Sequence, residues 1–353
     1  MKLLIEVPKR IHEQLSALLV KGEYEDLNQF VLVAVENQIR AESGEEDPWE
    51  VSAPVLEAET KTPLPLKGTL PVNGLLVRPF SYPIVSDHPI SSEFPSRPLW
   101  GQLYKFLPSK VGLRVLANMS KTGPPSLNQF RTTAAEIATG FRRVLVNMDR
   151  KLGRKFGEEL STSFPSNNDK SRKRFMDQYL IYFRSSNAKI DGLPARMGWL
   201  NVIKDGRSIS VGITKSGYEF AKLENPIIDH QGVEPLSSEE KDFILNHILA
   251  THRGEALHTA LVLRAISSGV ASREQLNQAM AVAYREHWND AESWSPAVIN
   301  TMRSGIISRL FELGLIEKQK TGVKVTYLVT AEGLMWLGRL GSRFEPLEVK
   351  TSG

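Results

Sequence analysis

The feature that most constrains the fold is a repeat in the second half of the chain. Two stretches carry the same kinds of residue at a constant offset of 116 positions. In each stretch the pattern predicts an apolar exit from a helix, a strand, a tight turn with glycine, a second strand and a short helix. The matched positions are Gly198-Trp199-Leu200 with Gly314-Leu315-Ile316, Gly206 with Gly322, Ile213-Thr214 with Val329-Thr330, and Gly217 with Gly333. We therefore predict two copies of one structural unit.

The second copy has clear start and stop signals. Ser295-Pro296 predicts the start of a helix that runs to Leu313, because serine caps a helix and proline suits its first turn. Residues 315–329 predict a β-hairpin that turns at Thr321-Gly322, and residues 331–337 predict a short closing helix. The buried face of the long helix is predicted to hold Ile299, Met302, Ile306, Ile307, Leu310 and Phe311.

The first copy, over about residues 101–223, has the same design with a longer and more basic insertion. A long helix is predicted from its apolar stripe, and a second helix begins at Asn168 or Asp169 and continues to Phe183. The hairpin would turn at Asp205-Gly206. Predicted core positions on the two helices are Ile137, Phe141, Leu145, Met148, Leu152, Phe156, Phe175, Tyr179 and Phe183.

Helices followed by a hairpin and a closing helix resemble the winged-helix family in both copies. The resemblance implies a recognition helix that lies in the major groove of DNA and a hairpin, the wing, that tracks adjacent phosphates. Earlier helices of the second copy are expected over 238–290, where Ser272 and Gln275 have the spacing of a capping box. The predicted fold class is mainly α with small β-hairpins.

The first 42 residues predict a strand, a helix, a turn and a second helix. This order resembles the ribbon-helix-helix family, the fold of the Arc repressor. About 40 residues cannot bury enough surface to fold alone, and the resemblance implies an obligate homodimer. The segment has a net charge of −2, so we expect it to dimerise rather than to dominate DNA binding. The dimerisation residues would be Leu3, Ile5, Val7, Leu15, Phe30 and Ala34.

Proline marks the connection between the N-terminal segment and the repeat. Residues 48–108 hold 11 of the 20 prolines, which excludes a long helix or a central strand there. We predict a tether over 43–70 and an extended arm over 71–100. The predicted domains are therefore 1–42 for dimerisation, 43–100 for linker and arm, 101–230 and 231–345 for the two winged-helix units, and 346–353 for a tail.

Positive charge is concentrated in one segment. The whole chain has a net charge of +4, but residues 100–222 carry 22 Lys and Arg against 9 Asp and Glu. Such a concentration is typical of a surface that binds a polyanion. A solvated helix face is the alternative for the arginines of the long helix. The candidate nucleic-acid-binding residues are Arg142, Arg143, Arg150, Lys151, Arg154, Lys155, Lys170, Arg172, Lys173, Arg174, Lys204, Arg207, Lys215, Lys320 and Lys324.

Geometry assigns different roles within this set. Arg172 and Arg174 are the best candidates for base contacts, because arginine can bind guanine O6 and N7 together. Lys204, Arg207 and Lys215 suit phosphate contacts. The second copy is only lightly basic within a net-acidic segment, so we expect it to bind either DNA or a protein partner.

Enzyme classes find little support in the sequence. The chain has no cysteine, which excludes disulfides, thiolate zinc sites, iron–sulfur clusters and cysteine nucleophiles. It has no P-loop, dinucleotide-binding or nucleophile-elbow motif and no His-Glu-x-x-His helix. His247, His252 and His258 have spacings that do not share a helical face, so surface or capping roles are expected. We expect no enzyme activity, no cofactor and no metal.

No apolar run approaches the roughly 20 residues that cross a bilayer. The start of the chain does not predict a signal peptide, because Glu6 and Pro8 interrupt its apolar stretch. We expect a cytoplasmic protein without membrane contact.

The sequence thus predicts a dimeric, double-stranded-DNA-binding protein, such as a transcriptional regulator or DNA-recognition factor. One alternative is an interaction or adaptor subunit of a multi-protein complex that acts on DNA, in defence or plasmid maintenance. The other is an RNA-binding protein, because phosphate attraction does not distinguish the two nucleic acids.

Overall fold

The computed structural model describes residues 96–154, 158–184, 189–206, 208–230, 232–270, 272–321 and 324–341. All of these belong to one compact unit. The predicted dimerisation segment 1–42, the predicted tether, Lys155 and Arg207 lie outside the described residues. No described helix is both long enough and apolar enough to span a bilayer.

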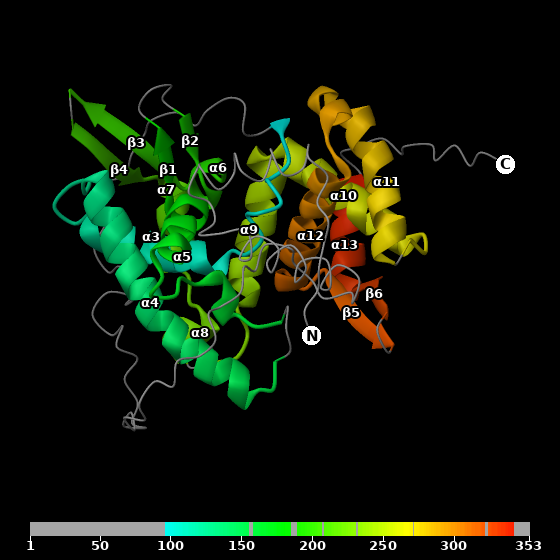
Figure 1. Cartoon of the computed structure of the whole chain (residues 1–353), viewed down its shortest axis with the longest axis horizontal. Coiled ribbons are helices and arrows are strands. Elements are labelled where there is room, and N and C mark those ends of the chain that lie inside the picture. The colour runs from blue at the N-terminus through cyan, green and yellow to red at the C-terminus, as the bar shows by residue number, and fades with distance from the viewer. Residues whose placement is uncertain are drawn as a thin grey trace, which may run out of the picture. The chain divides into compact units, whose positions relative to one another are not determined.

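The described chain is mainly helical, with small two-stranded antiparallel hairpins, as predicted (Figure 1). The first repeat occupies the cyan and green part of the ribbon. Its elements are α3 (Leu107–Met119), α4 (Leu127–Lys151), η2 (Ser161–Ser163), α5 (Asp169–Phe175), the π-helical turn η3 (Met176–Leu180), β1 (Tyr182–Arg184), β2 (Lys189–Asp191), α6 (Leu193–Arg196), β3 (Leu200–Asp205), β4 (Ser208–Ile213) and α7 (Lys215–Lys222).

The second repeat occupies the yellow to red part of the same ribbon (Figure 1). Ser272 and Gln275 form the predicted capping box at the start of α11, and Ser295 caps α12. The elements are α8 (Pro226–His230), α9 (Ser238–Thr251), α10 (Arg253–Ser267), α11 (Arg273–His287), η4 (Asn289–Ser293), α12 (Pro296–Glu312), β5 (Ile316–Thr321), β6 (Lys324–Val329) and α13 (Ala331–Gly341).

The two copies predicted from the sequence form equivalent hydrogen bonds at matched positions. Gly198 and Gly314 precede the two hairpins and have φ values of 66° and 75°, which suit glycine. The Oγ1 of Thr214 donates to the carbonyl of Gly198 at 2.7 Å, and Thr330 donates to Gly314 at 2.7 Å. Each threonine therefore closes its hairpin onto the turn that opens it.

The closing helices start in the same way in both copies. The N–H of Gly217 donates to Oγ1 of Thr214 at 3.2 Å, and the N–H of Gly333 donates to Oγ1 of Thr330 at 3.0 Å. A Cβ on Gly217 would lie 1.9 Å from the carbonyl oxygen of Trp199, and one on Gly333 would lie 2.1 Å from that of Leu315. Glycine is needed at both sites because the helix passes directly over a backbone carbonyl.

The two copies differ in the segment before the hairpin. In the second copy, α12 is one continuous helix that packs on α10 and α11. In the first copy, η3 and the short α6 pack on α3 and α5 packs on α4, while the hairpin β1–β2 is inserted between η3 and α6.

The predicted second helix of the first copy was therefore too long. It ends at Leu180, because Ile181 has an extended backbone and the following residues pair with β2. Phe183 lies opposite Ile190 in this hairpin and is half-buried. Phe175 and Tyr179 are buried as predicted.

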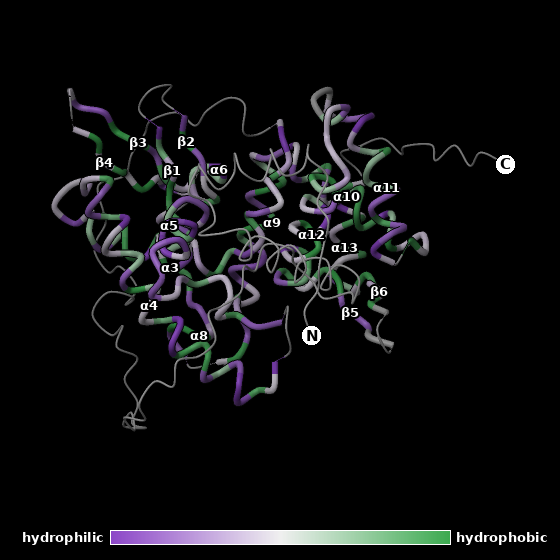
Figure 2. Tube along the Cα trace, in the orientation of Figure 1, coloured by the Kyte–Doolittle hydropathy of each residue, from purple (hydrophilic) through white to green (hydrophobic). Residues whose placement is uncertain are grey.

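Helix α4 starts earlier than its predicted stripe. Ser126 caps it by accepting a hydrogen bond from the N–H of Gln129 at 3.2 Å. Phe141 and Leu145 are buried as predicted, but Leu152 is 48% exposed because the helix has already ended at Lys151. Figure 2 shows hydrophilic and hydrophobic residues alternating along α4, as expected for a helix with one buried face.

Residues 96–106, the entry segment, lead into α3 of the first repeat and bind helices of the second repeat on the way. The N–H of Leu99 donates to Glu255 of α10 at 2.7 Å. The N–H of Phe106 donates to Glu312 of α12 at 2.6 Å, and that of Leu107 donates to it at 3.3 Å. Helix α3 has no side-chain cap of its own, so a carboxylate from the other repeat satisfies its first N–H groups.

Backbone packing fixes the same segment. A Cβ on Gly305 of α12 would lie 2.1 Å from the carbonyl oxygen of Gly101. A Cβ on Gly254 of α10 would lie 2.4 Å from the backbone of Arg97. The backbone of the entry segment therefore packs directly against the backbone of α10 and α12.

Candidate nucleic-acid interface

Helix α4 presents part of the predicted basic surface. Arg143, Arg150 and Lys151 are exposed, whereas Arg142 is half-buried. Arg143 and Arg150 are seven residues apart, which places them on one side of the helix, two turns from each other. This side of α4 can follow a row of phosphates.

Helix α5 presents a second group of cations. It starts at Asn168, whose Oδ1 accepts the N–H of Lys170 at 2.7 Å. Lys170, Lys173 and Arg174 are exposed. The side chain of Arg172 is 31% exposed and its guanidinium lies 3.9 Å from Glu136 of α4, a loose contact that a phosphate could replace.

The hairpin β3–β4 is held beside α4. The N–H of Val211 donates to the carbonyl of Pro125 at 3.0 Å, and Ser210 forms a β-bridge with Ser126, the cap of α4. Lys204, at the end of β3, is exposed and its Nζ lies 5.3 Å from the centre of the Phe183 ring. Lys215, the first residue of α7, is also exposed.

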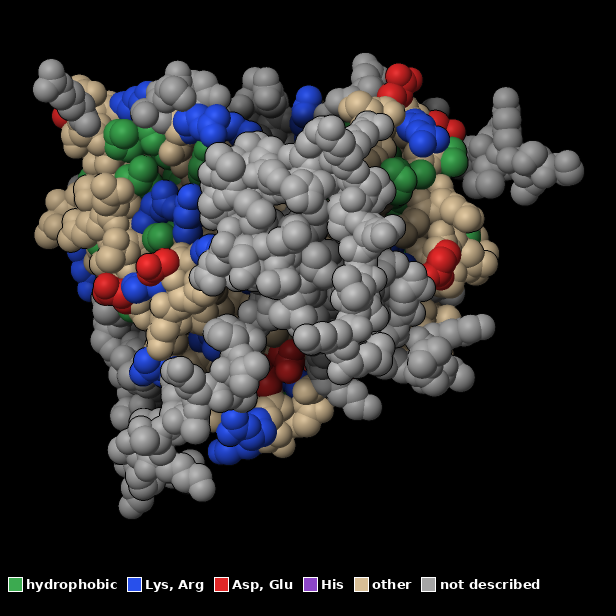
Figure 3. Space-filling view, in the orientation of Figure 1, with side chains coloured by type: hydrophobic (Ala, Val, Ile, Leu, Met, Phe, Trp, Pro, Cys, Tyr) green, Lys and Arg blue, Asp and Glu red, His purple; other side chains and the backbone are tan. Residues whose placement is uncertain are grey.

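Figure 3 shows how these side chains are distributed on one face. Lys and Arg side chains appear over the part of the molecule that holds α5 and along α4 to its end, interrupted by a small group of acidic side chains. Exposed cations of the first repeat thus gather over two neighbouring helices.

Arg154 lies three residues after the end of α4 and differs from the exposed arginines of that helix. Its Nη1 lies 2.9 Å from Oδ1 of Asp149, and its Nη2 donates to the carbonyl of Val233. The same carboxylate accepts the N–H groups of Leu160 at 3.2 Å and Ser161 at 3.0 Å. Arg154 therefore fixes the chain that follows α4, and we leave it out of the candidate interface.

Helix α12 of the second repeat uses its arginines internally. Arg303 and Arg309 are the only basic residues of α12, and they are 2% and 1% exposed. Arg303 donates to Asn277 at 3.1 Å and to Asn300 at 2.6 Å. Arg309 donates to Glu255 and to the carbonyl of Leu103, each at 2.8 Å. Helix α12 therefore exposes no cation to a phosphate.

The basic residues of the second hairpin are only partly described. Lys320 lies in β5 and Lys324 in β6, but their side chains lie outside the described residues. The Nζ of Lys318 lies 5.0 Å from the centre of the Phe311 ring. The structure therefore places the backbone of Lys320 and Lys324 on this hairpin but does not test their predicted role.

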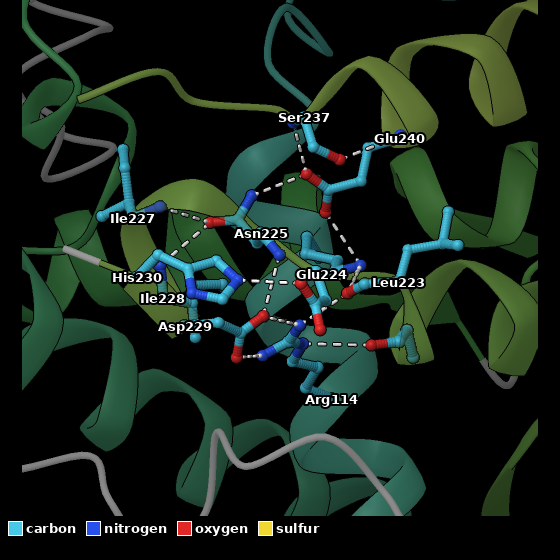
Figure 4. Close-up of polar contacts among 12 residues, drawn as sticks. Arg114, Leu223, Glu224, Asn225, Ile227, Ile228, Asp229, His230, Ser237 and Glu240 are labelled. Atoms are coloured by element: carbon cyan, nitrogen blue, oxygen red, sulfur yellow. Dashed lines mark hydrogen bonds and ion pairs between the residues drawn. The ribbon is translucent and has the colours of Figure 1, made fainter. Parts of the chain in front are cut away.

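Some cations of the basic segment lie in the interior, which sequence reasoning missed. Figure 4 shows Arg114 of α3 pointing to Asp229 of α8, with two nitrogen–oxygen contacts of 2.7 and 2.6 Å. Its guanidinium also donates to the carbonyls of Ala221 at 3.0 Å and Leu223 at 2.7 Å. This arginine attaches α8 and the end of α7 to α3.

Lys110 lies one turn before Arg114 and is also buried. Its Nζ lies 2.8 Å from Oε1 of Glu240 on α9, and both side chains are 0% exposed. Burial lowers the pKa of Lys110 to about 8, and Glu240 opposes this shift. The sequence signal was two cations four residues apart within an otherwise apolar helix.

The histidine prediction was wrong in part. His252 and His258 are 2% and 0% exposed, so they are not surface residues, because α10 packs against α9, α11, α12 and α13. The Nε2 of His258 lies 2.7 Å from the hydroxyl of Tyr284. Within the described ranges, no three His, Cys, Asp or Glu side chains come together in a way that could hold a metal ion.

Comparison with protein-family models, with curated proteins and with solved structures gives no match for this chain.

Proposed function

We propose that the chain is a non-enzymatic DNA-binding protein with two winged-helix units and an N-terminal dimerisation segment. In the first unit, α3, α4 and α5 with η3 are the three helices and β3–β4 is the wing. In the second, α10, α11 and α12 are the helices and β5–β6 is the wing. The order of elements, the helix contacts and the bridge from Ser126 to β4 support this assignment.

One contrast carries the proposal. The helices that precede the wing in the two units differ in how they use positive charge. Helix α5 exposes Lys170, Lys173 and Arg174, whereas α12 buries both of its arginines. The first unit therefore binds the phosphate backbone, and the second unit supports the first.

Binding follows from counterion release. Each lysine or arginine that neutralises a phosphate frees condensed cations, which gives affinity for any duplex. Arg172 and Arg174 can add base selectivity through guanine. A dimer formed by residues 1–42 would bring two such surfaces to one duplex and raise the effective concentration of the second contact. This is the behaviour of a transcriptional repressor or autoregulator.

The test is duplex binding as a function of salt concentration. Replacing Arg172, Lys173 and Arg174 with alanine should weaken binding. Each lost phosphate contact should also make the negative slope of log K against log salt less steep by about 0.9. Arg285→Ala, at an exposed site on α11, is the control and should leave both quantities unchanged. Unchanged affinity in the triple variant would contradict the proposal, and stronger binding to RNA than to DNA would favour the RNA alternative.

Dimerisation is tested separately. A chain without residues 1–42 should sediment as a monomer, and its DNA affinity should fall because the second contact is lost. A dimer that persists in sedimentation would place the association surface elsewhere.

The adaptor function is the second candidate, and one observation favours it. The second unit exposes apolar side chains: Leu328 is 43% exposed, Leu334 is 53% exposed and Met335 is 52% exposed. Exposed apolar side chains are more typical of a surface that contacts protein than of one that contacts phosphate. On this view the first unit binds DNA and the second unit recruits a partner protein.

A further inference from the structure

A cleft lies beside the end of α5. It has a volume of about 290 Å³, just below the usual range for small-molecule sites. The entry segment supplies Trp100 and Gln102 to its wall, α5 supplies Arg174, η3 supplies Gln178 and β1 supplies Tyr182. Three separate segments of the chain, over residues 100–103, 174–182 and 191–192, therefore meet at this cleft.

The wall combines flat rings with amide groups. Trp100 and Tyr182 are aromatic side chains that are only half-buried, so part of each ring remains accessible. Gln102 and Gln178 are half-buried and can each both donate and accept hydrogen bonds. Aromatic rings stack on nucleobases, and a glutamine amide, which offers both a donor and an acceptor, can pair with a base edge that carries both.

The charge of the cleft suits an anion. Asp177 forms an ion pair with Arg131, and Asp191 lies 2.6 Å from Nε of Arg196 and accepts the N–H of Gly192 at 2.8 Å. The two carboxylates are thus matched by two guanidinium groups. Arg174 adds a positive charge at the wall of the cleft.

The backbone beside the cleft is unusual. Residues 176–180 form a π-helical turn, which presents Asp177 and Gln178 to the cleft. π-helical turns are rare and occur frequently at functional sites. Helical geometry therefore points to this cleft independently of its side chains.

We propose that the cleft binds one nucleotide, with its base against Tyr182 and Trp100, its base edge at Gln178 and its phosphate at Arg174. The nucleotide is either a free mononucleotide or an unpaired nucleotide of a strand held on α5. The second source rests on the proposed function, and the first does not. The volume admits a single nucleotide but no duplex.

The test uses 2-aminopurine, whose fluorescence falls when the base stacks. One arm titrates the full chain with free 2-aminopurine deoxyribonucleoside monophosphate. The other arm compares a duplex that carries 2-aminopurine as an unpaired extra nucleotide with a duplex in which the same base is paired. When the chain is added, quenching is expected for the free nucleotide, for the unpaired nucleotide in the duplex, or for both. No quenching is expected for the duplex in which 2-aminopurine is paired.

Variants assign the quenching to the cleft. Tyr182→Leu and Gln178→Ala should each weaken base binding at least about fivefold, a loss typical of one base–aromatic or base-edge contact. Arg285→Ala, at an exposed site on α11 outside the cleft and the candidate interface, should leave base binding of the free nucleotide unchanged. If Tyr182→Leu fails to fold by circular dichroism, Gln178→Ala alone decides the result.

The outcomes separate this inference from the proposed function. Quenching by the free nucleotide without any duplex binding would support the cleft and contradict the proposed function. Duplex binding without quenching, or quenching that both variants leave unchanged, would overturn the cleft. Dependence on Gln178 only in the unpaired duplex would identify the strand as the source of the nucleotide.

Discussion

Single residues decide how the two repeats are joined. Arg309 is fully buried and binds a carboxylate of α10 together with two backbone carbonyls of the entry segment. The partners of Arg309 belong to parts of the chain that are 54 to 210 positions away. A buried charge of this kind is costly to leave without its partner.

Arg309→Met should lower the free energy of unfolding by about 3–5 kcal/mol, because Glu255 would stay buried without its cation. Arg285→Met, at an exposed site on α11, should change it by no more than about 0.5 kcal/mol. Urea unfolding of both variants measures the difference. Equal effects would show that the buried pair contributes nothing specific.

His252 should make the protein sensitive to acid. Burial lowers its pKa to about 4, with a further contribution from His247. The unfolded chain binds this proton near pH 6.5, so between pH 6.5 and pH 4 the unfolded state holds more protons and stability falls as the pH falls. This group should remove about 2 kcal/mol between pH 7 and pH 5.

The variant His252→Asn tests this pH dependence. It should lose about 2 kcal/mol less than the natural chain when urea unfolding at pH 7 is compared with pH 5. Gln278→Asn, at an exposed and uncharged site on α11, serves as the control and should keep the natural pH dependence. An unchanged pH dependence in His252→Asn would assign the acid sensitivity to other groups, including buried His258 and half-buried His247.

At the scale of elements, the hairpins and closing helices of the two repeats are held by the same contacts. The same threonine–glycine hydrogen bonds occur in both, and the same glycine allows each closing helix to pass over a carbonyl. The requirement is steric and local, so it can be tested within a single helix.

Helix α13 contains a matched pair of glycines. Gly333→Ala would place a methyl group 2.1 Å from the carbonyl oxygen of Leu315 and should cost about 1–3 kcal/mol. Gly338→Ala meets no atom within 4 Å and should stabilise by about 0.5–1 kcal/mol, because alanine favours the helix. Thermal unfolding of the two variants should shift in opposite directions. A shift in the same direction would contradict the packing described here.

The elements that could be predicted are those specified by local chemistry. The caps at Ser272 and Ser295 and the two hairpins follow from a few adjacent residues, and the structure confirms them. The hairpin β1–β2 could not be predicted, because the aromatic spacing of Tyr179 and Phe183 is also that of a helix. Its strands depend on pairing across residues 185–188, which no local propensity specifies.

The candidate interface could be predicted only in composition. The sequence shows which segment is basic, but not which cations are exposed. Lys110 and Arg114 belong to the same basic segment as Lys173, yet their carboxylate partners lie beyond residue 228. Only the tertiary structure separates interior cations from those that can meet a phosphate. The cleft has no sequence signal, because its wall comes from three separate segments.

At the scale of the whole described unit, the two repeats should behave as one. Buried pairs join α3 to α8 and α9, and the entry segment binds α10 and α12. The aromatic core is also continuous, since the rings of Phe220 and Phe243 stack at 5.6 Å. Separate unfolding of either repeat would break these contacts.

Native-state hydrogen exchange measures this coupling. The slowest amides of α3 and α10 should open with the same free energy, because one global event exposes both. Glu312→Ala should lower both values equally, although its side chain belongs to α12 and caps α3. A lower opening free energy for α3 alone would show that the repeats unfold independently.

The cap that Glu312 supplies to α3 has a consequence for synthesis. While the ribosome is still translating the second repeat, the first N–H groups of α3 have only water as an acceptor, because that carboxylate lies 206 positions downstream of Phe106. The first repeat therefore lacks this cap until the nascent chain has emerged past α12. Prematurely terminated products would keep this helix end open, and they should be cleaved faster by added protease than the full chain.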